Sequence, residues 1–160
     1  MPQPIWRKIV PELAIPEPGK QWRMAVPLLT VGKVMRVQVV IDTNRAPPVP
    51  GTWTPAGFAA PCTADGDFDA TARGQVAQSG TLLVASAPPG ALIARIGGST
   101  ADQTPDTAST PSRITFSIGR ECIFTVPTTP TGSLFLGVND DPSRMADVAG
   151  QLIVDIFEAI

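Results

Sequence analysis

Proline and glycine interrupt the apolar sequence so often that no stretch is long enough for an extended helix or a membrane span. The chain has 160 residues, and 18 of them are Pro and 14 are Gly. The apolar runs between them are short and rich in Val, Ile and Thr, which favours strands. No run approaches the roughly 18 apolar residues of a membrane helix. The sequence therefore predicts an all-β domain of about eight to ten short strands, arranged as a two-sheet β-sandwich.

The clearest strand is predicted at 34–42, which reads VMRVQVVID. Side chains alternate between the two faces of a strand, so Arg36 and Gln38 share one face. The opposite face is entirely apolar and is expected to face the core: Met35, Val37, Val39 and Ile41.

Other short apolar runs predict further strands. These lie at 22–26, 81–85 and 91–96. Residues 113–118 and 122–126 are separated by Gly119-Arg120-Glu121, a spacing typical of a hairpin. The alternating runs around 134–138 and 152–156 predict a second, final hairpin with a longer polar loop.

The first twenty residues are expected to be a Pro-rich N-terminal extension, with the sandwich domain spanning 21–160. Residues 5–10 alternate loosely and could form an edge strand, after which Pro11 and the following prolines are expected to prevent regular structure. Trp6 and Trp22 either pack at the sandwich margin or form a contact between subunits.

Charge and residue supply exclude several functions. Twelve basic and 14 acidic residues give a net charge of −2, so nothing indicates binding to nucleic acid or to an anionic membrane. The chain has no His and no Tyr, which leaves few groups for acid–base catalysis, so an enzyme is the least favoured class. The two cysteines, Cys62 and Cys122, are expected to be free thiols.

The N-terminal sequence also bears on where the protein is found. Its first twenty residues lack the basic head, apolar centre and cleavage site of a secretory signal. A cytoplasmic location, or export without a classical signal peptide, is therefore expected.

The polar loop of the final hairpin holds three carboxylates, Asp140, Asp141 and Asp147. Carboxylate oxygens and main-chain carbonyls are the ligands that calcium prefers. Asp-rich turns that only bond their own backbone have a similar composition, so the residues alone leave both interpretations open.

Four spaced segments carry a resemblance to a known family. They read GALIARIGG (90–98), TFSIG (115–119), GSLFLGVNDDP (132–142) and GQLIVDI (150–156). Together they resemble the bacterial calcium-dependent galactophilic lectins of the PA-IL type. The resemblance implies a β-sandwich whose last loop binds calcium, and through it galactose.

The resemblance also implies a set of calcium ligands. Asp140 stands where the family has a carboxylate that binds both calcium and sugar, and Asp147 stands at an Asn ligand. Arg144 and Leu29 stand where the family uses main-chain carbonyls. Val148 stands at the second Asn ligand, where its isopropyl group offers no donor atom.

The sugar pocket that the resemblance implies differs from that of the family at two positions. Ala70 and Arg73 stand where the family contacts galactose with a His and a Gln. The expected sugar-binding residues are Asp140, Asp141, Asp147, Trp53 and Arg73, with Gln75 as a further candidate.

Two functions of different classes therefore stay open. The first is a lectin-like domain that binds a galactose-type carbohydrate through loop-bound calcium, in a homo-oligomer because weak single-site sugar binding gains from repetition. The second is a structural or protein-interaction sandwich that keeps the fold but has lost both calcium and sugar. Val148 and the missing His favour the second, whereas Asp140, Asp147 and the loop length favour the first.

Overall fold

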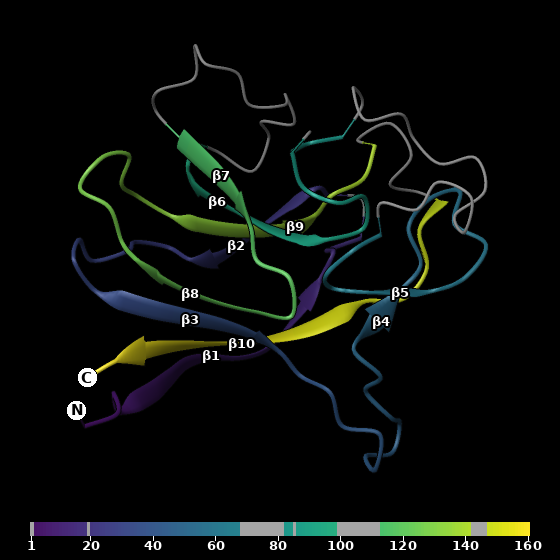
Figure 1. Cartoon of the computed structure of the whole chain (residues 1–160), viewed down its shortest axis with the longest axis horizontal. Helices are drawn as coiled ribbons and strands as arrows, with labels where there is room; N and C mark the ends of the chain where they lie inside the picture. The colour runs from purple at the N-terminus through teal and green to yellow at the C-terminus, as the bar shows by residue number, and fades with distance from the viewer. Residues whose placement is uncertain (1, 19, 68–81, 85, 99–112, 142–146) are drawn as a thin grey trace.

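The chain folds into two antiparallel four-stranded sheets packed face to face, which confirms the predicted all-β sandwich (Figure 1). The computed structural model describes residues 2–18, 20–67, 82–84, 86–98, 113–141 and 147–160. The first sheet has the order β1 (Trp6–Ile15), β10 (Leu152–Ala159), β3 (Val34–Val39) and β8 (Glu121–Thr125). The second has the order β2 (Trp22–Val26), β9 (Leu134–Val138), β6 (Leu92–Gly97) and β7 (Arg113–Ser117). A short pair, β4 (Thr52–Trp53) and β5 (Cys62–Thr63), lies at one end.

The main core lies between the two sheets, where alternation along each strand places the apolar side chains. In β3, Met35, Val37 and Val39 are buried, as their spacing predicts. Ile41 follows the end of β3 and is 56% exposed, so the prediction that it faces the core is wrong. Each large side chain buried here contributes roughly 1.5–3 kcal/mol to folding.

A second apolar cluster covers the outer face of the second sheet. It consists of Trp22, Leu83, Val84, Ala87, Ile93 and Phe135. The predicted strand at 81–85 is not formed in its described residues, 82–84, which instead pack on the sheet as a loop. Because of this cover, every residue of β6 and β9 is buried, and Trp22 belongs to the packed margin.

Neither predicted hairpin forms, because both connections cross from one sheet to the other. β7 belongs to the second sheet and β8 to the first, and β9 and β10 are divided in the same way. Between β7 and β8, Ile118 turns inward and is 5% exposed, and its N–H donates to Leu92 O at 2.8 Å. Gly119 follows with φ +67 and directs the chain into the first sheet.

The N-terminal residues extend the first sheet further than predicted. β1 continues through Pro11 to Ile15 as an edge strand paired with β10, so proline does not end the regular structure there. The register with β10 shifts between Val10 and Leu13, and this irregularity accommodates Pro11 in the strand. Trp6 is half-buried, with the Arg36 guanidinium 5.2 Å from its ring.

The two ends of the chain lie side by side, at the end of the sandwich opposite β4 and β5 (Figure 1). The Ile160 N–H donates to Ile5 O at 2.9 Å. Within the described residues, no helix is long and apolar enough to cross a membrane.

Candidate functional site

The candidate site lies where β9 ends, and we call residues 54–56, 139–141 and 147–149 the loop cluster. Asn139 is fully buried at its base. Its Nδ2 donates to the carbonyl oxygens of Val84, Ala87 and Pro88 at 2.9, 3.0 and 3.1 Å. Its Oδ1 accepts a hydrogen bond from Val84 N–H at 2.9 Å. Asn139 therefore ties Val84, Ala87 and Pro88 to the end of β9.

The carboxylate of Asp140 is 3% exposed and is positioned by two main-chain donors. Its Oδ2 accepts a hydrogen bond from Ala56 N–H at 2.8 Å, and its Oδ1 accepts one from Asp141 N–H at 2.7 Å. These two bonds fix the orientation of the Asp140 side chain.

The segment 54–56 holds both ends of the acidic loop. Thr54 N–H donates to Ala149 O at 2.7 Å, and Ala149 N–H donates to Thr54 O at 2.9 Å. Ala56 bonds the Asp140 carboxylate at the other end of the same loop. Asp147 precedes Ala149 by two residues and is exposed. Asp140 and Asp147, which were predicted to bind the same calcium ion, therefore lie at the same end of the sandwich.

Leu29 does not join the loop cluster. Its N–H donates to Gly132 O at 2.8 Å, which places it where β9 begins, whereas Asp140 follows the last residue of β9. The whole length of β9 separates the two. The main chain that reaches Asp140 is that of Ala56, a residue that the sequence reasoning missed because its side chain carries no signal for a main-chain contact.

Trp53 is part of the core and offers no ring face to a sugar. It is 1% exposed, and its indole Nε1–H donates to Gly90 O at 2.8 Å. The prediction that Trp53 contacts carbohydrate is corrected by this burial. Its hydrogen bond to Gly90 O instead holds β4 close to the residues that lead into β6.

The remaining residues considered for the site are Val148 and four residues that the structure does not describe. Val148 is half-buried and packs against the main core, so its side chain supplies no ligand atom. Arg73, Arg144, Ala70 and Gln75 lie outside the described residues. Within the part of the chain that the structure describes, no three His, Cys, Asp or Glu side chains are grouped closely enough to hold a metal ion together.

A half-buried thiol borders the loop cluster. Cys62 Sγ donates to Gly90 O at 3.9 Å, the same carbonyl that Trp53 uses. Burial raises the pKa of Cys62 to about 12, and the negative charges of Asp67 and Asp140 act in the same direction. Cys62 and Cys122 are both free, as predicted.

No protein-family model matches the chain, and no curated protein matches it either.

Proposed function

We propose that the loop cluster binds a galactose-type carbohydrate with the help of a calcium ion. The observation that carries this proposal is the buried Asp140 carboxylate, which two main-chain N–H groups hold in a fixed orientation at the end of β9. The pairing of Thr54 with Ala149 supports it, because it returns the acidic loop to the same segment that holds Asp140.

The donor chemistry of the loop cluster fits calcium in part. Calcium takes six to eight oxygen ligands, and Asp140, Asp141 and Asp147 are the described carboxylates of this loop. The side chains alone do not complete the set, since Val148 contributes none. Main-chain carbonyls of the loop and hydroxyl groups of the sugar would supply the remaining oxygens.

The residues of the chain have their own roles in this proposal. A bound calcium would accept two neighbouring sugar hydroxyls as ligands and so favour sugars with that arrangement. Asp140 and Asp147 would accept hydrogen bonds from the same hydroxyls, which fixes the orientation of the ring. The buried anchor of Asp140 keeps its carboxylate from reorganising on binding, which lowers the cost of association.

A second candidate function is a structural or protein-interaction sandwich without calcium. Two observations favour it: the core packing of Val148 at a predicted ligand position, and the burial of Trp53 at a predicted sugar-contacting position. In this alternative, Asp140 and Asn139 serve only to close loops onto the end of β9.

Calorimetric titration with calcium and retention on a galactose resin separate the two functions. The lectin proposal predicts measurable heat on adding calcium and retention that EDTA abolishes. The scaffold predicts neither heat nor retention. Sedimentation of the same sample tests the proposed homo-oligomer, which would present several weak sites at once.

A further inference from the structure

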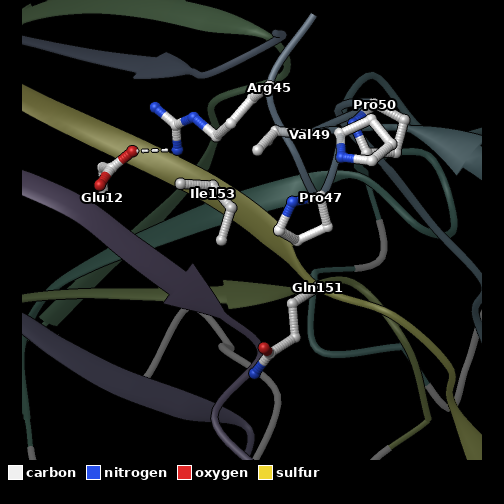
Figure 2. Close-up of a pocket in the computed structure, with 8 residues that line it drawn as sticks. Glu12, Arg45, Pro47, Val49, Pro50, Gln151 and Ile153 are labelled. Carbon is white, nitrogen blue, oxygen red and sulfur yellow. Dashed lines mark hydrogen bonds and ion pairs between the residues drawn. The ribbon is translucent and has the colours of Figure 1, made fainter. Parts of the chain in front are cut away.

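A groove of about 440 Å³ lies between the 42–50 loop and the start of β10. This volume is in the range of small-molecule sites, roughly 300–1,000 Å³. Figure 2 shows Pro47, Val49 and Pro50 facing Ile153, with Glu12, Arg45 and Gln151 around them. The groove therefore combines an apolar floor with a polar rim.

The apolar floor is held by the main chain. Asp42 and Val49 form an isolated antiparallel bridge, with N–H to O distances of 2.8 and 2.9 Å in the two directions. The prolines between and beside these residues have fixed φ angles, so the floor is rigid without a ligand. A preformed apolar surface of this kind costs little entropy to use in binding.

The polar rim is also fixed by the backbone. Glu12 has φ +50, a left-handed conformation that is rare for a residue other than glycine. Its N–H donates to Asp155 Oδ1 at 2.8 Å, and this bond stabilises the unusual conformation. The same conformation directs the Glu12 carboxylate to the Arg45 guanidinium, with which it forms an ion pair (Figure 2).

The rim retains donors and acceptors after its internal bonds are made. Arg45 has five N–H donors, of which one bonds Glu12, while its Nε lies 3.7 Å from Asp42 Oδ2. Gln151 gives one amide hydrogen to Pro16 O at 2.8 Å. Two carboxylates around one guanidinium leave the rim slightly negative, which disfavours an anionic ligand. A neutral ligand with many hydroxyl groups fits this rim better.

The groove is next to the loop cluster along two stretches of chain. Gln151 is separated from Ala149 only by Gly150, and Val49 leads through β4 to Thr54. Residues 49–54 and 149–151 therefore connect the groove to the loop cluster, and the hydrogen bonds between Thr54 and Ala149 hold the two stretches together at the cluster end.

We propose that this groove is a subsite for a second sugar residue, in a glycan whose terminal galactose-type unit occupies the loop cluster. The inference rests on the proposed function. A pyranose ring carries apolar C–H groups on its faces and hydroxyls around its edge. The C–H groups would pack on Pro47, Pro50 and Ile153, and the hydroxyls would bond Glu12, Arg45 and Gln151.

Calorimetry with calcium present tests the subsite, using methyl galactoside and a galactose-terminated trisaccharide as probes. The trisaccharide is expected to bind the native protein about tenfold more tightly than the monosaccharide. Val49→Trp fills the groove while keeping the main-chain bridge to Asp42, and it should abolish this advantage without changing monosaccharide binding. Ile123→Trp, on exposed β8, is the matched control and should keep the advantage.

The possible outcomes distinguish the two proposals. Equal affinity for both probes, or an advantage that survives Val49→Trp, overturns the subsite and leaves the lectin proposal standing. Trisaccharide binding that persists in EDTA but is lost in Val49→Trp supports sugar binding in the groove and overturns the calcium site. Binding of neither probe overturns both. Glu12→Gln adds a second readout, because it should weaken only the trisaccharide.

Discussion

The Asn139 side chain and the Val84 main chain bond each other in both directions. Val84 N–H donates to Asn139 Oδ1, and Asn139 Nδ2 donates to Val84 O, each at 2.9 Å. This is the pattern of two paired strands, made by a side chain at the end of β9. It attaches residues 82–84, which do not form a strand, to the second sheet. Leu83 of this loop and Phe135 of β9 are buried in the same apolar cluster.

We expect Asn139→Ala to lower the free energy of unfolding by about 2–4 kcal/mol. The substitution leaves Val84 N–H and Ala87 O without a partner, at roughly 1–3 kcal/mol for each buried group left unsatisfied. Val84 O and Pro88 O keep the hydrogen bonds that Ala87 N–H and Ala91 N–H donate. Urea denaturation followed by tryptophan fluorescence measures the change. Asn44→Ala, at an exposed loop position, is the control and should change stability by less than about 0.5 kcal/mol.

Gly137→Ala should destabilise the protein more than Gly32→Ala. A Cβ at Gly137 would lie 2.3 Å from the main-chain oxygen of Gln21, so β2 and β9 must separate to accept it. A Cβ at Gly32 meets nothing within 4 Å, and only its φ of +83 opposes the change, at roughly 1–2 kcal/mol. Thermal unfolding of the two variants provides the comparison. A smaller loss for Gly137→Ala would contradict the close pairing of β2 with β9.

Cys62 should be the slower of the two thiols to react with a maleimide at pH 8. Burial raises the pKa of Cys62 to about 12 and also raises that of Cys122, so the reactive thiolate is scarce at both sites and scarcest at Cys62. Mass spectrometry of peptides from timed samples gives the two rates. In guanidinium chloride the rates should become equal, and a difference that persists there would rule out burial as the cause.

The same pKa shift predicts a loss of stability at high pH. The unfolded chain releases the Cys62 proton near pH 9, whereas the folded protein holds it up to about pH 12. The unfolded state therefore binds fewer protons between these values, and stability falls as pH rises through this window. Denaturation of the native protein and of Cys62→Ala from pH 8 to pH 11 should show a steeper decline in the native protein.

If the loop cluster binds calcium, Asp140→Asn should abolish the rise in melting temperature that calcium produces. A ligand that binds only the folded state stabilises it by about 2.7 kcal/mol at one hundred times its dissociation constant. Asp65→Asn is the control, because Asp65 forms an ion pair with Arg120 and is not one of the proposed calcium ligands. An unchanged calcium response in Asp140→Asn would exclude this carboxylate as a ligand.

Val148→Asn should tighten calcium binding while lowering the stability of the calcium-free protein. The amide oxygen would supply a ligand that the isopropyl group lacks, but removing a half-buried apolar side chain weakens the core contact of Val148. Calorimetric titration and melting temperature, measured with and without calcium, report the two effects separately. A variant that is less stable but binds calcium no better would favour the scaffold function.

Local periodicity was sufficient to predict β3 and the sandwich class, because alternation of apolar residues directly records which face is buried. It failed at the connections. A three-residue link such as 118–120 can form either a hairpin or a crossing between sheets. In this protein the crossing forms, because Ile118 is buried and its N–H bonds Leu92 O. That contact joins residues far apart in the sequence, so no local pattern encodes it.

The candidate site was predictable only where side chains carry the chemistry. Asp140 is a candidate because of its residue type and because the resemblance places it at a ligand position. Ala56 was missed because it acts through its main-chain N–H, and Trp53 was misplaced because a tryptophan has the same sequence signature in a core as on a binding surface. Burial, which decides between those two roles, depends on the packing of both sheets.

The pairing of β10 with both β1 and β3 makes the completion of the first sheet depend on the strand of the sandwich that comes last in the sequence. While a ribosome is still adding Leu152–Ala159, β1 and β3 lack the strand that lies between them, and their apolar faces stay open to solvent. Unpaired strand edges of this kind favour aggregation. Chaperone capture should be strongest for truncated chains that stop before Leu152.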